Sequence, residues 1–188
     1  MDKTITKLGK IFTEMVKNEN KYGDWWKNIA LGHEAYNLML TLPDTYPGEY
    51  ETPADKGNLL SQMLDQMNET ESPRFCITVR EEIERLNPDD ENNKKDLAKL
   101  RDFIDLSLPM EEYCKRYRRH LKFDPVERTE EYEAVLPEVE KQVARKLRLV
   151  RRGMGFCFAY WSTKRDVLAR HGIEWHSPAL MNPGVMFD

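Results

Sequence analysis

Apolar residues recur every three or four positions along most of this 188-residue chain, with charged residues between them. That period is typical of amphipathic α-helices, and no segment shows the strict alternation of a half-buried strand. The pattern predicts an all-α protein, a compact multi-helix single domain with about seven helices. They are expected over residues 1–20, 24–42, 53–67, 73–86, 88–104, 110–121 and 138–172.

Three of these helices begin with a start signal. Thr52-Pro53 and Ser72-Pro73 each place a capping side chain before a proline that suits the first helical position. The run 87–90 (Asn-Pro-Asp-Asp) adds carboxylates that suit the positive end of the helix dipole. An acidic connector over 124–140 contains two prolines, which are expected to limit any helix there.

The stretch 138–172 is expected to form one long C-terminal helix at the centre of the fold. Because it is apolar on two sides, the other helices should pack around its second half. Its main apolar stripe consists of Val139, Val143, Leu147, Val150, Met154, Cys157, Trp161 and Leu168, and a narrower one of Leu149, Phe156, Tyr160 and Val167.

Small side chains follow on a further face of that helix, at Gly155, Ala159 and Ser162. Glycine is costly inside a helix, so Gly153 and Gly155 indicate either a kink or close packing of another backbone. Close packing fits the small residues that follow, and these three positions are candidate contacts with a partner protein.

Residues 173–188 form an extended apolar C-terminal arm, which the sequence separates from a helical domain over 1–172. Two X-Pro steps keep it extended, yet it carries large apolar side chains that favour burial. The arm is expected to dock, either on its own helices, which is favoured, or on a partner. Its candidate contacts are Trp175, Met186 and Phe187.

Basic residues form the one charged pattern that suggests a binding surface. If the helices over 110–121 and 138–172 lie side by side, their cations make a patch suited to phosphate groups. The alternative is that the acids of the connector pair with them, or that they form a solvated face. The candidate phosphate contacts are Lys141, Arg145, Arg148, Arg152, Arg116 and Arg119.

Charge and cysteine content narrow the function classes. A net charge of −4 argues against a dedicated nucleic-acid coat but permits a local basic surface. Three widely spaced cysteines favour reduced thiols rather than a disulfide framework, and no signal peptide is evident. A cytoplasmic protein is expected, without a membrane partner, because no run is long enough to span a bilayer.

The patterns of catalytic and metal sites are missing from the sequence. No histidine pair has the spacing of a helical zinc site, and no Gly-x-Ser-x-Gly or phosphate-binding loop occurs. The sequence therefore predicts no catalytic residue, metal or cofactor. An enzyme would need a pocket in which two or more acids or histidines converge from separate helices.

The end of the chain, GMGFCFAYWSTKRDVLARHGIEWHSPALMNPGVMFD, has a Gly-rich aromatic start, a Tyr-Trp before basic residues, and two Pro motifs. Over residues 153–188 it resembles uncharacterised proteins of gut bacteria and their phages or mobile elements. The resemblance implies a phage or mobile-element origin and assigns no activity. The expected function is a non-enzymatic interaction or structural protein with a protein partner or self-association; a nucleic-acid-binding accessory protein is the alternative.

Overall fold

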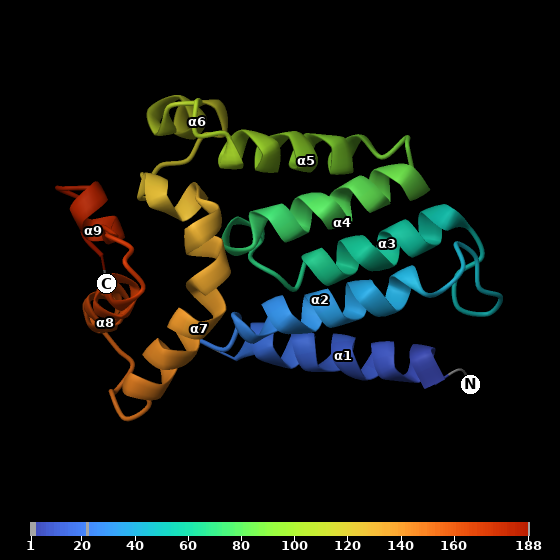
Figure 1. The fold of residues 1–188 in the computed structure, drawn as a ribbon, viewed down its shortest axis with the longest axis horizontal. Coiled ribbons are helices and arrows are strands. Elements are labelled where there is room, and N and C mark those ends of the chain that lie inside the picture. The colour runs from blue at the N-terminus through green and yellow to red at the C-terminus, as the bar shows by residue number, and fades with distance from the viewer. Residues whose placement is uncertain (1–2, 22, 188) are drawn as a thin grey trace. The chain divides into compact units, whose positions relative to one another are not determined.

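The computed structural model describes residues 3–21 and 23–187, and this part of the chain is helical (Figure 1). Its regular structure consists of nine α-helices and two short 3₁₀-helices, with an isolated bridge between Tyr46 and Tyr50. The all-α prediction is confirmed for these residues. The helix count exceeds the expected seven because residues 138–172 do not form one helix and because the C-terminal arm contains a short one.

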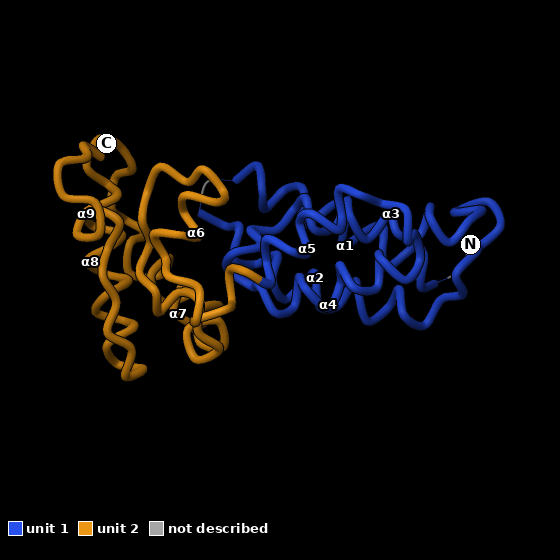
Figure 2. The backbone as a smooth tube through the Cα atoms, turned by 90° about the horizontal axis from the view of Figure 1, so that it is seen from above, with its two compact units in different colours: residues 1–101 blue, residues 102–188 orange. Residues whose placement is uncertain are grey.

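The chain divides into two compact units, Met1–Arg101 and Asp102–Asp188 (Figure 2). The sequence favoured a division at 172/173 instead. In the structure, the described residues of the arm belong to the second unit together with the helices that precede them.

The first unit packs its helices around one apolar core. Figure 1 shows α1 to α4 side by side, each in contact with the next. Met15, Ala35, Met63, Cys76 and Val79 are completely buried there, as the helical apolar period predicts. The elements are α1 (Lys3–Asn20), α2 (Lys27–Leu40), α3 (Pro53–Leu64), η1 (Glu69–Glu71), α4 (Pro73–Leu86) and most of α5 (Glu91–Ile104).

The start signals behave differently in the three helices that carry them. Thr52 and Asp55 form a reciprocal capping box before α3, in which each side chain accepts a hydrogen bond from the other residue's backbone N–H. Ser72 precedes Pro73 in α4 but makes no side-chain cap. At α5, Asp90 accepts from the backbone N–H of Asn93, so this helix begins after the predicted start.

A buried lysine fixes the loop between α2 and α3. Lys56 is almost fully buried, and its ammonium donates to the carbonyl of Leu42 at 2.9 Å and to Asp44 at 3.2 Å. Arg85 donates to both oxygens of Asp44. Hydrogen bonds from Arg85 and Lys56 lower the pKa of Asp44 to about 2, so its carboxylate ties the loop to α3 and α4.

The second unit is built around α7. Its elements are α6 (Met110–Arg116), η2 (Pro125–Arg128), α7 (Glu130–Lys146), α8 (Phe156–Arg170) and α9 (Pro178–Met181). The helix α7 runs through the expected connector and through Pro137, because Thr129 caps its start and Tyr132, Leu136 and Val139 are buried along it. The expected limit on helix formation in this acidic segment was therefore wrong.

One arginine closes the end of α5 in the second unit. Arg128 is buried and donates to the carbonyl oxygens of Asp102, Phe103, Asp105 and Leu108. The last carbonyls of a helix lack intrahelical partners, and they also form the negative end of its dipole. The guanidinium of Arg128 donates hydrogen bonds to these carbonyls and places a positive charge at the negative end of the dipole, while burial lowers its pKa.

The single long helix expected over 138–172 is not present. The helix α7 ends at Lys146, and α8 begins at Phe156 after a turn in which Gly155 has a φ of 80°. Only glycine adopts such a backbone conformation without strain, and no atom lies within 4 Å of a Cβ added at Gly153 or Gly155. The two glycines mark a chain reversal rather than close packing.

The expected apolar stripe is divided by this break. Val139, Val143, Leu147 and Leu168 are buried, but Val150 and Met154 are exposed, while Cys157 and Trp161 are half-buried. The fully buried residues of α8 are Lys164, Val167 and Leu168, all in its second half. The described helices include none long and apolar enough to cross a lipid bilayer.

We expect Asp44→Asn to destabilise the protein above about pH 4. The folded-state pKa of Asp44 is depressed, so its contribution is present above the unfolded pKa and is lost as pH falls towards 2. The side chain is partly exposed, which limits the loss to about 1 kcal/mol. Urea midpoints measured at pH 6 and down to pH 2 should converge for the wild type and the variant.

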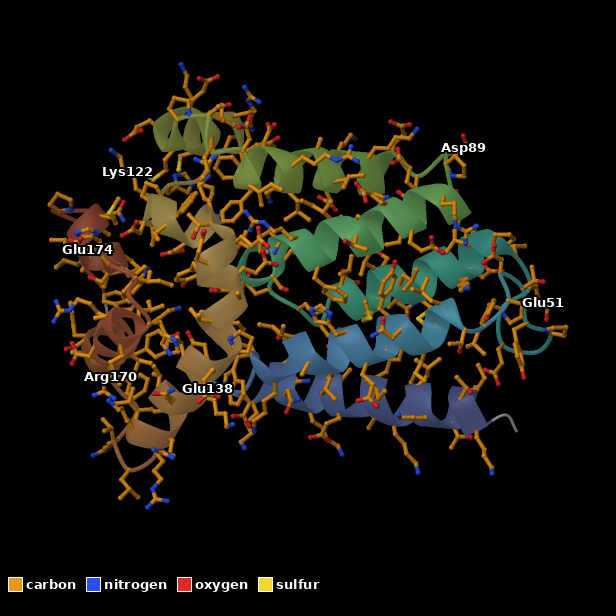
Figure 3. All side chains as sticks on the ribbon, viewed as in Figure 1. Glu51, Asp89, Lys122, Glu138, Arg170 and Glu174 are labelled. Carbon is orange, nitrogen blue, oxygen red and sulfur yellow. The ribbon has the colours of Figure 1, made fainter. Side chains whose placement is uncertain are left out.

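Asp89→Asn is the matched control, since Asp89 lies on the exposed loop before α5 and its side chain points outward in Figure 3. Because Asp89 is exposed and makes only a screened interaction with the α5 dipole, the urea midpoints of Asp89→Asn at pH 6 should differ from those of the wild type much less than those of Asp44→Asn do. Equal effects of the two substitutions at pH 6 would contradict the role given to Asp44.

Candidate interaction surface

The turn between α7 and α8 exposes apolar side chains beside several cations. We call residues 147–155 the cationic turn. Its first residue, Leu147, is buried and its amide donates to the carbonyl of Val143, so the turn is fixed to α7. Beyond it, Leu149 is 86% exposed, Val150 41% and Met154 94%. Three large apolar side chains are thus open to solvent within six residues of one turn.

The sequence around the turn contains basic residues and no acidic ones. Between Glu140 and Asp166 there is no acidic residue, whereas eight basic residues occur. These are Lys141, Arg145, Lys146, Arg148, Arg151, Arg152, Lys164 and Arg165.

Within the part of the chain that the structure describes, four of these eight cations have an ion-pair or ring partner and four do not. Lys141 pairs with Glu138 at 3.5 Å, but both side chains are exposed, so the pair is weak. Arg152 lies over the ring of Phe156 at 5.5 Å. In the described residues no carboxylate forms an ion pair with Arg145, Lys146, Arg148 or Arg151, all of which are exposed.

A buried ion pair anchors the base of this surface. Lys164 of α8 lies 2.8 Å from Glu140 of α7, and both side chains are almost fully buried. The hydroxyl of Tyr160 donates to the same carboxylate at 2.6 Å. The ammonium also lies 5.5–5.7 Å from the ring centres of Tyr132, Tyr160 and Trp175, which is within the range of cation–π attraction.

The arm docks on its own unit at three polar positions. The indole N–H of Trp175, only 4% exposed, donates to Glu127, and burial raises the pKa of that carboxyl. The backbone N–H of His176 donates to Asp124. Further on, the side-chain amide of Asn182 donates to the carbonyl of Lys122 and accepts from its N–H. The arm therefore covers part of its own core in the structure.

The sequence-predicted partner contacts do not form one face. Gly155 belongs to the turn, Ala159 is half-buried and Ser162 is exposed on α8. Trp175 is buried, whereas Met186 is 95% exposed. Phe187 packs edge-to-face on Trp161 at 5.1 Å.

The sequence-predicted phosphate contacts separate into two groups. Lys141 and Arg145 lie on α7, and Arg148 and Arg152 on the cationic turn, so the end of α7 gathers them. Figure 1 shows α6 near the beginning of α7, at the end opposite the turn.

The arginines in and just after α6 also have partners within the second unit. Arg116 forms ion pairs with Asp102 and Glu112, and Arg119 lies over the ring of Phe123. The structure does not bring the two basic clusters together.

A groove of about 900 Å³ lies beside the arm. Asp166, Glu174 and His176 line it, and the Nδ1 atom of His176 lies 2.8 Å from the buried carboxylate of Asp124. Figure 3 labels Glu174, which lines the groove, as well as Arg170 at the end of α8 and Glu138 on α7. The contact between His176 and Asp124 fixes the start of the arm next to η2.

Metal and thiol chemistry have little support among the described residues. No group of three or more histidine, cysteine, aspartate or glutamate side chains is placed to hold a metal ion there. The three cysteines are free thiols, and burial raises the pKa of Cys114. A raised thiol pKa lowers the fraction of reactive thiolate.

Comparison with known proteins gave no match to a family model, a curated protein or a solved structure.

Sequence reasoning missed the Glu140–Lys164 pair and the exposure of the turn. Glu140 lies beside buried Val139 on α7, a position where an acid is unusual, and Lys164 follows two half-buried aromatic residues. A charge of each sign on apolar helix faces was the signal that could have indicated a buried pair. Leu149 and Met154 are exposed because they lie in the turn between α7 and α8. The prediction of one continuous helix left no room for such a turn.

We expect Glu140→Leu to destabilise the second unit by about 3–5 kcal/mol, because it removes the carboxylate from a buried ammonium. Combining it with Lys164→Met should restore most of that loss, since apolar replacement of a buried pair is often neutral. Urea unfolding followed by tryptophan fluorescence would measure both.

The matched control is Glu138→Leu, two residues earlier on the same helix. It breaks the exposed pair with Lys141 and the exposed hydrogen bond from Gln142, and it should destabilise the protein much less because water already screens both contacts. If the two glutamate substitutions destabilise equally, the pair is not the anchor described above.

Proposed function

We propose that the protein is a non-enzymatic interaction protein that binds an anionic partner through the cationic turn. The observation that carries this proposal is the exposure of Leu149 and Met154 beside Arg145, Arg148 and Arg151, which form no ion pair with a carboxylate of the described residues. An encoding phage or mobile element is part of the proposal and rests on the resemblance of residues 153–188.

The charge pattern favours a partner of opposite sign over a second copy joined turn to turn. Such a contact would bring Arg145, Lys146, Arg148 and Arg151 against the same residues of the other copy. Like charges facing each other across an interface oppose association. An anionic partner gains from the same cations, and the apolar side chains add contact area at their centre.

The arm contributes to this function indirectly. Trp175, Asn182 and Phe187 hold it on its own unit, which leaves Met186 as its most exposed contact candidate. By covering Lys164 with the Trp175 ring, the arm supports the α7–α8 pair from which the turn extends.

Nucleic-acid binding is the second candidate function. It is favoured by the run of basic residues without an acid between Glu140 and Asp166, because phosphate contacts need cations above all. Nucleic-acid binding does not use Leu149 and Met154. Replacing these two side chains therefore distinguishes it from the first proposed function.

We expect the protein to be retained on immobilised heparin, a generic polyanion, and to elute as salt increases. The variant Arg145→Glu/Arg148→Glu/Arg151→Glu should lose this retention. A control with the same change in net charge is Lys10→Glu/Lys17→Glu/Lys99→Glu, at exposed positions of the first unit. Equal losses in both variants would show that only net charge matters and would contradict the proposed surface.

If the second candidate is correct, labelled DNA will bind with an affinity that falls steeply with salt. Fluorescence anisotropy should then show that Leu149→Ser/Met154→Ser binds as the wild type does, while the triple arginine variant does not. No binding at low salt would exclude this candidate, and a loss in the serine variant would show that apolar contacts take part.

A further inference from the structure

We propose that the anionic partner of the cationic turn is the surface of a lipid bilayer that contains acidic lipids, with Leu149 and Met154 inserted among the acyl chains. This inference rests on the proposed function, because it names the partner of the same surface. It concerns a peripheral contact, so it departs from the sequence-based expectation of no membrane partner, which rested on the lack of a spanning segment.

The apolar side chains provide the first argument. Leu149 and Met154 are 86% and 94% exposed, and Val150 lies between them in the same turn. Phe158, half exposed in the first turn of α8 that follows, packs edge-to-face on Trp161 at 5.5 Å. Exposed aliphatic and aromatic side chains close together in the sequence are typical of protein segments that enter the interfacial region of a bilayer.

The position of the cations provides the second argument. Arg148, Arg151 and Arg152 alternate with the apolar residues within the turn, and Arg145 and Lys146 precede it on α7. When the apolar tips enter the bilayer, these cations reach the level of the headgroup phosphates. Each basic residue near an acidic membrane raises the partition coefficient about fivefold, so several together produce measurable binding.

The rigidity of the turn's base provides the third argument. Leu147 is buried at its start, and the Glu140–Lys164 pair joins the two helices that flank it. The backbone N–H of Phe156 donates to the carbonyl of Gly153, which closes the reversal before α8. The two ends of the turn are therefore fixed to the helices that flank it, which limits the ordering that binding requires.

A bilayer fits these observations better than a nucleic acid or an acidic protein. Phosphate contacts with nucleic acid would use the cations and leave Leu149 and Met154 in water. A protein partner would need a hollow that matches the projecting side chains, whereas a fluid bilayer accepts them without one.

The test is sedimentation of the full chain with vesicles of phosphatidylcholine alone and with about 30% phosphatidylserine, an acidic lipid that gives a negative surface. We expect binding to the mixed vesicles that is at least tenfold stronger than to the neutral ones. Leu149→Ser/Met154→Ser should reduce it about tenfold or more, and Arg145→Glu/Arg148→Glu/Arg151→Glu should abolish it.

The control is Leu106→Ser/Leu180→Ser, which replaces two exposed apolar side chains of the same unit outside the turn. It should bind mixed vesicles as the wild type does. Full binding by Leu149→Ser/Met154→Ser would overturn the insertion, and so would an equal loss in the control.

Heparin retention separates failure of this inference from failure of the proposed function. Retention that depends on the turn arginines, without vesicle binding, overturns the membrane assignment and leaves an anionic partner in place. If DNA binds at the same salt concentration while vesicles do not, the partner is nucleic acid. Absence of both heparin and vesicle binding overturns both proposals.

Discussion

A buried ion pair between neighbouring helices organises the second unit. Glu140 and Lys164 meet where α7 and α8 pack, and the rings of Tyr132, Tyr160 and Trp175 surround the ammonium. Placing two charges in an apolar interior is favourable only when geometry and hydrogen bonds compensate for lost hydration. Such a requirement restricts the register of one helix on the other, and Trp175 brings the arm into the same arrangement.

The fixed register of α7 on α8 explains why the fold exposes apolar side chains in the turn between them. With α7 and α8 joined near the middle of each helix, the residues between them must reverse direction in a short turn. Leu149 and Met154 then have no helix to cover them, although each would be stabilised by about 1.5–3 kcal/mol on burial. The exposed apolar side chains are thus a consequence of the tertiary arrangement.

The sequence predicted the helical class and several boundaries because these depend on local chemistry. The capping box at Thr52 and Asp55 is an example, since both partners lie within one turn. The break after Lys146 was missed because the apolar period continues through it by coincidence, and Gly153 and Gly155 were interpreted as packing residues. The positions of Trp175 and Lys164 depend on residues about twenty or more positions away, which periodicity does not encode.

The hydrogen bonds of Arg128 determine where the chain can be divided into its two units. Its guanidinium holds carbonyls from Asp102 to Leu108, so the end of α5 is tied to η2 although most of α5 belongs to the first unit. A cut placed after Ile104, where the helix ends, would strip this arginine of two of its acceptors. The natural place to separate the two halves for expression is therefore inside a helix, just before Asp102.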